Sequence, residues 1–232
     1  MKHLVHPYWN QYPPMDPFWT KLVGAFLVLI CIISFVGNGI VVYIFSTTKS
    51  LRTPANLLVL NLAFSDFLMM LSAGPMMVVN LFFETWVLGP LMCDVYSMFG
   101  SMFGCISIWS MSMIALDRYN VIVKGMAGRP MTIKLALMKI LVVWSIAAFW
   151  TIGPVVGWSR YCIKIYLYVV HDIFITYRNV PEGNMTSCGI DYMTRDWNPR
   201  SYLIFYSLFV YYTPLFFICY SYWFIIAVSV LQ

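Results

Sequence analysis

One carboxylate in this sequence stands where a charge is costly. Asp66 lies inside a long apolar run, in the segment Leu62-Ala63-Phe64-Ser65-Asp66. An ionisable side chain within a membrane-length apolar helix is expensive and typically marks an ion site or an internal polar network. We predict that Asp66 and Asn38 belong to such an intramembrane network. The alternative is a carboxyl group that is simply hydrogen-bonded to a neighbour such as Asn38.

A second polar group, Asp117-Arg118-Tyr119, closes an uncharged apolar run. An aspartate beside an arginine at the low-dielectric edge of a membrane can hold the guanidinium through charge-assisted hydrogen bonds until a partner competes for it. The alternative is ordinary anchoring at the membrane interface. Because the triplet stands at the end of an uncharged span, we favour its interpretation as a coupling site for a cytoplasmic partner over simple anchoring.

Five of the six cysteines fall into two groups by their surroundings, and the sixth, Cys162, is the first residue of the stretch 162–179. Cys31, Cys105 and Cys219 lie within apolar runs, where a free cysteine behaves as a small buried hydrophobe. Cys93 and Cys188 lie outside the runs, where a disulfide could persist. No CxxC pair or other cluster predicts a metal, redox or catalytic site, so we do not expect an enzyme.

The composition indicates a chain solvated by lipid. Hydrophobic residues make up 61% of the 232 residues and charged residues only 10%, whereas soluble domains carry roughly a quarter charged residues. A helix crosses the hydrocarbon core with about 20 apolar residues, and continuous runs without strict alternation favour helices over barrel strands. We predict an all-α membrane protein with five transmembrane helices at about residues 22–46, 54–83, 92–120, 136–158 and 200–232.

The charges in the connections predict the orientation. Lys and Arg occur in residues 46–53 and 119–139, whereas the connection at 84–94 carries only acids. Because Lys and Arg prefer cytoplasmic loops, the N-terminal tail, residues 1–21, is expected outside, and residues 159–200 form a long extracellular loop. The first helix is expected to direct membrane entry without a cleaved signal peptide. Cations that flank apolar runs do not favour nucleic-acid binding.

Several features recur in consecutive helices and in a fixed order. They are Gly37-Asn38-Gly39, residues 62–66, Asp117-Arg118-Tyr119, Trp144 with Pro154, and Pro214 with Tyr222. Together they resemble the rhodopsin-like family of G-protein-coupled receptors. Five further segments are residues 50–54, 86–90, 117–125, 157–161 and 180–192. Residues 157–161 and 180–192 look like the retinal-plug loop of visual opsins, and the other three segments look like arthropod visual opsins, nearest the long-wavelength insect type.

The resemblance implies a seven-helix photoreceptor for phototransduction with 11-cis-retinal as its chromophore. A heterotrimeric G protein of the Gq class and arrestin would be its partners, with Asp117-Arg118-Tyr119 in the coupling and activation role. The rhabdomeric photoreceptor membrane would be its location.

The resemblance also implies roles for single residues. Cys93 would bond Cys188. Tyr96 stands where vertebrate visual opsins carry a glutamate counterion, so the counterion role would pass to Glu182, because a buried protonated Schiff base needs a carboxylate partner. A solvated loop carboxylate is the alternative for Glu182. The positions matching the retinal pocket are Tyr96, Gly100, Ser101, Gly104, Tyr206 and Tyr211. For the small residues among them, close helix packing is the alternative.

Two departures from the family pattern stand out. The sequence stops at Gln232, in or just after the fifth predicted helix, so no counterpart of the retinal-binding lysine of the seventh helix is present. We therefore expect this chain to bind no retinal covalently. The stretch 162–179 interrupts the opsin-like loop; it is strand-like in composition, and we interpret it as a retained intron or an errant gene model. Asn184 begins a glycosylation sequon.

Other functions remain open at this point. A receptor of the same family for a diffusible amine would place an aspartate in the upper third helix, and residues 95–116 carry no charge. A five-helix transporter or channel would need further ionisable residues along a path, and Asp66 is alone. A truncated product without signalling activity is the remaining alternative.

Overall fold

The protein is a bundle of long helices. The computed structural model describes residues 11–13, 16–125, 128, 130–155, 158, 179–181, 186–190 and 196–231. Within these ranges, five helices are long and apolar enough to cross a membrane. The first four are α1 (Pro17–Thr47), α2 (Pro54–Phe82), α3 (Gly89–Ile122) and α4 (Ile133–Val155). The fifth is built in succession from α5 (Trp197–Tyr206), the π-helical segment η5 (Ser207–Tyr212) and α6 (Thr213–Leu231). The predicted all-α membrane fold is confirmed.

The helix starts follow from local capping chemistry. The Asp16 side chain accepts a hydrogen bond from the Phe18 amide at 2.8 Å, and Pro17 occupies the first turn, a combination that favours helix initiation. Helix α1 therefore begins before the predicted residue 22. Thr53 caps α2 in the same way, accepting from the Asn56 amide at 3.3 Å. A short 3-10 turn, η3 (Lys49–Leu51), connects α1 to α2.

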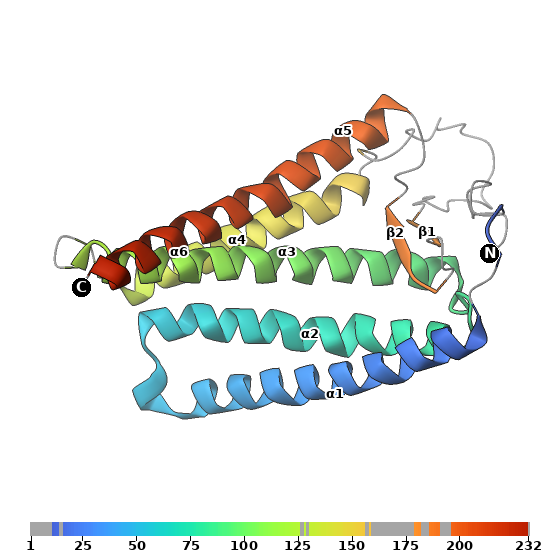
Figure 1. Cartoon of the computed structure of the whole chain (residues 1–232), viewed down its shortest axis with the longest axis horizontal. Helices are drawn as coiled ribbons and strands as arrows, with labels where there is room; N and C mark the ends of the chain where they lie inside the picture. Colours follow the sequence, from blue (N-terminus) through green and yellow to red (C-terminus); the bar gives the residue numbers. More distant parts are fainter. Residues whose placement is uncertain are drawn as a thin grey trace, which may run out of the picture.

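Helix α3 is the centre of the bundle. It packs against α2 on one side and against α4 and α6 on the other, while α1 contacts α2 (Figure 1). Aromatic and aliphatic residues from α3, α4 and the fifth helix form the main core. The Tyr202 hydroxyl in this core donates to the Trp150 carbonyl at 2.8 Å. The outer helix faces carry many exposed large hydrophobic residues, as expected for a surface in contact with lipid.

A small β-hairpin lies against one end of α3. Strands β1 (Asn179–Pro181) and β2 (Cys188–Ile190) pair antiparallel, with Pro181 opposite Cys188. Both strands contact α3, at the end of the bundle opposite the C-terminus (Figure 1). The sequence did not predict this hairpin. Of the interrupting stretch 162–179, only Asn179 lies among the described residues.

Candidate functional site

A disulfide joins the hairpin to α3. Cys93 and Cys188 are bonded, with their Cα atoms 5.4 Å apart, well within the range that a disulfide requires. This confirms the pairing that the family resemblance implies. The two cysteines form a buried cluster with Trp86, whose indole N–H donates to the Gly89 carbonyl at 2.8 Å. The loop before α3 and strand β2 are therefore fixed to each other.

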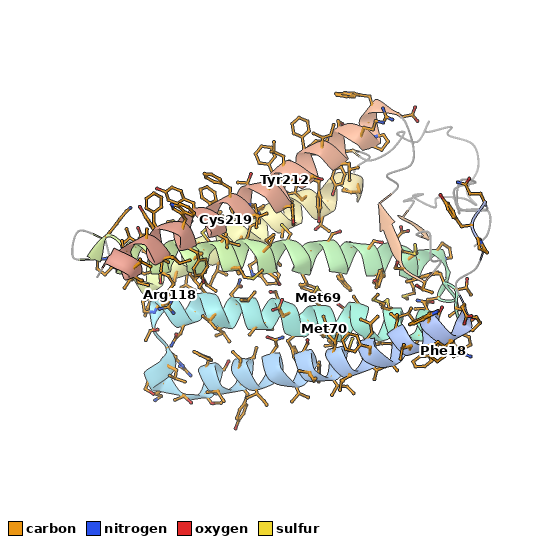
Figure 2. The ribbon with its side chains drawn as sticks, in the orientation of Figure 1. Phe18, Met69, Met70, Arg118, Tyr212 and Cys219 are labelled. Carbon is orange, nitrogen blue, oxygen red and sulfur yellow. A yellow bond between two sulfur atoms is a disulfide. The ribbon has the colours of Figure 1, made fainter. Side chains whose placement is uncertain are left out.

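A cavity of about 390 Å³ opens beneath this disulfide. Its size falls within the usual range for small-molecule sites. The walls come from α1, α2, α3, α5 and β2, and the lining residues are Leu27, Ile30, Cys31, Met69, Met70, Ala73, Gly74, Met77, Tyr96, Ser97, Gly100, Ser101, Cys188, Gly189 and Tyr206. Met69 and Met70 are labelled on α2 in Figure 2. The lining is mainly apolar, with a few hydroxyl groups.

The structure brings together four of the six predicted pocket residues. Tyr96, Gly100, Ser101 and Tyr206 all line the cavity. Gly104 and Tyr211 do not. Tyr211 is 52% exposed and its ring packs against the neighbouring Tyr212 instead, 5.2 Å between centroids.

The glycines of α3 are surrounded by space rather than by another helix. A Cβ atom added at Gly100 or Gly104 would meet nothing within 4 Å, whereas one added at Gly74 would lie 3.2 Å from the Cys31 sulfur. Close packing through a small residue thus occurs between α1 and α2, at Gly74. It does not account for Gly100, where the missing side chain leaves room in the cavity.

No lysine is among the residues that line this cavity. The lysines in the part of the chain that the structure describes lie near helix ends or in connections, at Lys21, Lys49, Lys124, Lys134 and Lys139. An amine able to form a Schiff base is therefore not supplied to the cavity by the described residues.

Asp66 takes part in a polar network between helices, but its partners differ from the predicted one. The Ser107 hydroxyl donates to the Asp66 carboxyl group, and Ser65 and Ser107 share a hydrogen bond of 3.0 Å. The prediction that Asn38 is a partner was wrong, because the Asn38 amide donates to the Ser34 carbonyl of its own helix at 2.9 Å. A serine at position 107 gave no signal in the sequence, since serine is common in helices.

Asn61 forms a second junction one turn away, joining three helices. Its amide nitrogen donates to the Ser110 hydroxyl on α3, and its oxygen accepts from the Trp144 indole on α4, both at 2.8 Å. Asn61 is buried, so each of these bonds is shielded from competing water. The sequence motifs included Trp144 but did not reveal Asn61 as its partner.

The Asp117-Arg118-Tyr119 triplet lies at the opposite end of α3 from the disulfide. Arg118 is exposed and Asp117 is buried; Figure 2 shows Arg118 at the far end of the bundle from Phe18. The two side chains do not form an ion pair, and the one salt bridge among the described residues joins Lys21 to Glu84 at 3.8 Å. The hypothesis that Asp117 holds the Arg118 guanidinium is therefore wrong for this conformation.

Tyr119 is the member of the triplet that bridges helices. Its ring lies 5.6 Å from that of Tyr220 and 6.0 Å from that of Phe224, both on α6. The Lys124 ammonium lies 5.4 Å from the centre of the Tyr119 ring, a cation–π distance. Arg118, the preceding residue, is exposed.

Three predicted features fall outside the described residues. These are the counterion candidate Glu182, the sequon at Asn184 and nearly all of the stretch 162–179. Their roles stay predictions.

Comparison with known proteins identifies the class. The family model for the seven-transmembrane receptors of the rhodopsin family matches residues 37–230, and the chain belongs to this family. The crystal structure of squid rhodopsin superposes with a TM-score of 0.81 at 36% identity, covering 96% of this chain and 56% of the squid chain.

Within the family, the chain is similar to insect visual pigments. It is 68% identical over 227 residues to opsin Rh1 of Calliphora vicina, covering 98% of this chain and 56% of that protein. Opsin Rh1 of Drosophila melanogaster is 64% identical with the same coverage, and the rhodopsin of Camponotus atriceps is 56% identical over 97% of this chain and 55% of the ant protein. The resemblance to arthropod visual opsins is confirmed. The chain spans about half the length of these relatives.

Proposed function

We propose that this chain is part of a light-activated receptor, a visual opsin, whose chromophore is 11-cis-retinal. The observation that carries the proposal is the cavity beneath the Cys93–Cys188 disulfide. The similarity to opsins supports it, since one 68% identical relative is an opsin. A mainly apolar cavity suits a polyene, because burial of apolar surface drives its binding. The open space at Gly100 leaves a path for the polyene along α3.

The charge of a protonated Schiff base needs compensation inside such a cavity. No carboxylate is among the lining residues, and Tyr96 occupies the position of the vertebrate counterion. Glu182 directly follows β1 in the sequence and stands six residues before Cys188. We assign the counterion role to Glu182, since an opposite charge favours the protonated Schiff base.

The far end of the bundle would meet the signalling partners. The exposed guanidinium of Arg118, beside the Tyr119 contacts with α6, offers charge-assisted hydrogen bonds to a protein docking there. This partner would be a heterotrimeric G protein of the Gq class, with arrestin as a competitor. A disulfide is favoured in an oxidising compartment, and this supports an orientation with the cavity end and the N-terminus outside and Arg118 in the cytoplasm of a photoreceptor cell.

The part of α3 that lines the cavity carries no carboxylate for an amine ligand. An amine receptor would place a carboxylate against the bound ammonium, because an unpaired buried charge is costly. Among the described residues of the cavity wall there is none, and Asp94 of α3 does not belong to the lining.

Reconstitution tests the proposal. The complete receptor that contains this segment, expressed and incubated with 11-cis-retinal, is expected to acquire a visible absorbance band that is lost or shifted on illumination. Gly100→Leu should abolish or strongly reduce the band by filling the cavity. Gly37→Leu is the matched control, because a Cβ there also meets nothing within 4 Å but the residue is exposed on α1, outside the cavity. A band that survives Gly100→Leu unchanged would contradict this cavity as the retinal site.

A further inference from the structure

The end of the bundle that carries Arg118 has positive charge that the described residues of that end do not balance. Its exposed cations are Lys49, Arg52, Arg118, Lys124 and Lys134. Among the described residues of this end, the acid is Asp117, which is buried. The opposite end is different, because an acid and a base pair directly there, Glu84 with Lys21 at 3.8 Å. An anionic partner from outside the chain is therefore favoured at the Arg118 end.

The connection between α1 and α2 holds two of these cations at the boundary of the membrane. Helix α1 ends at Thr47 and α2 begins at Pro54, and both are long and apolar enough to cross a bilayer. A connection as short as residues 48–53 between two such helices lies at the level of the lipid headgroups. Lys49 and Arg52 are exposed there. Since α1 packs mainly against α2, this corner lies at the edge of the bundle, next to lipid (Figure 1).

Arg52 is held in place while most of its donors stay unused. Its Nη2 atom donates to the Ser46 carbonyl at 2.6 Å, and the Asn56 amide fixes the connection by donating to the Leu51 carbonyl at 2.8 Å. A guanidinium has five N–H donors, and the bond to Ser46 is the one hydrogen bond that the Arg52 side chain donates to a described residue. Capping of α1 uses that one bond and does not account for Lys49 beside it. A guanidinium oriented in this way suits the oxygen atoms of a phosphate group.

We propose that Lys49 and Arg52 bind the headgroup of an anionic phospholipid in the adjacent leaflet of the bilayer. Charge complementarity selects an anion, and the place of the connection at headgroup level selects a lipid as its source. The remaining cations of this end add to the positive potential and concentrate anionic lipid around the receptor. The binding uses the edge of the bundle, so it leaves Arg118 to a docking protein. It depends neither on retinal nor on a G protein.

Native mass spectrometry of the complete receptor in detergent, titrated with phosphatidylserine, measures the Kd of the tightest lipid site. The double variant Lys49→Gln with Arg52→Gln should weaken this site by roughly 10- to 30-fold, because it removes two cations that attract an anionic headgroup. Phosphatidylcholine has no net charge and should bind weakly and equally to the wild type and the variant. Added salt should weaken phosphatidylserine binding to the wild type, since the attraction between exposed charges is screened.

Lys21→Gln is the matched control. Lys21 is also an exposed lysine near the end of a membrane-spanning helix, but it pairs with Glu84 at the opposite end of the bundle. Its loss should leave the Kd for phosphatidylserine unchanged. Lys49→Gln alone keeps the bond from Arg52 to Ser46, so it separates loss of lipid binding from loss of local structure. It should weaken the site by about fivefold.

The proposal is overturned if the double variant binds phosphatidylserine as tightly as the wild type, or if Lys21→Gln weakens binding as much. It is also overturned if the wild type binds phosphatidylcholine as tightly as phosphatidylserine, because charge would then not be the cause. Where the double variant does not fold, Lys49→Gln decides by itself: a weakened site supports the proposal, and an unchanged Kd overturns it.

Discussion

The Trp144 indole N–H on α4 donates to the side-chain oxygen of Asn61 on α2, at 2.8 Å, while the Asn61 amide donates to Ser110 on α3. One buried carboxamide therefore holds three helices together. In a membrane such bonds have no water to replace them, although measured contributions stay modest because the separated helices find other partners.

We predict that Asn61→Ala destabilises the bundle by about 1–2 kcal/mol, because it removes two interhelical hydrogen bonds of modest strength. Thermal unfolding in detergent measures the loss. Trp144→Phe, which removes one of the two bonds and keeps an aromatic ring, should cost less. Asn38→Ala is the control, because Asn38 is bonded only within its own helix. An equal loss of stability in Asn38→Ala would contradict the assignment.

The disulfide makes a second prediction. Cys93→Ala should lower stability by about 2–4 kcal/mol, the typical contribution of a bridge that closes a long loop; the sequence separation here is 95 residues. Cys219→Ala should have little effect, because this cysteine is free and exposed on the outside of the bundle. Unfolding monitored with and without reductant provides the test. If reductant destabilised the Cys93→Ala variant as much as the wild type, another bridge would be responsible.

A third prediction concerns the counterion. In the complete receptor with retinal, Glu182→Gln should lower the Schiff-base pKa, so that a larger fraction is deprotonated at neutral pH and the absorbance moves to the blue. The sign follows because the carboxylate stabilises only the protonated form. Glu84→Gln serves as the control, since Glu84 pairs with Lys21 at 3.8 Å and does not line the cavity. An unchanged titration would transfer the role to Asp94 or Asp191.

The fourth prediction concerns residues 1–232 expressed alone. Incubation with 11-cis-retinal and then borohydride should yield no adduct that survives denaturation. The described lysines lie away from the cavity, and moving an ammonium to the middle of the membrane costs about 2.5–3.5 kcal/mol on insertion scales. The complete receptor is the positive control. A visible band retained after reduction and denaturation would show that one of these lysines, or one outside the described residues, reaches the chromophore.

The sequence predicted the helices well because their signal is long and continuous. It placed the start of α1 too late, since residue 22 is where apolar character begins, whereas Asp16 and Pro17 start the helix by capping. The π-helical segment η5 was not predicted, because it changes the hydrogen-bond pattern without changing apolar character. The hairpin was missed because three-residue strands are too short to give a pattern.

Site residues of a type that is rare in such helices or loops were predicted from the sequence, and site residues of a common type were missed. Cys93 and Cys188 stood out as cysteines outside the apolar runs, and Asp66 as a charge within one. Their environment includes serines and an asparagine that carry no comparable signal, so Ser107 and Asn61 emerged only from the structure. Asn38 was assigned to Asp66 by type alone, and helix geometry instead gave it a carbonyl of its own turn.

The bond between Cys93 and Cys188 also restricts the number of times that the chain can cross the membrane between these two residues. Two cysteines can be joined only on the same face of a membrane, so the segment between them must cross an even number of times. Helices α3 and α4 supply two crossings. During synthesis, Cys93 can therefore pair with Cys188 only after α4 has been inserted across the bilayer. The closure of the cavity is thus a late event in assembly, and any change that stalls the insertion of α4 would leave Cys93 as an unpaired thiol.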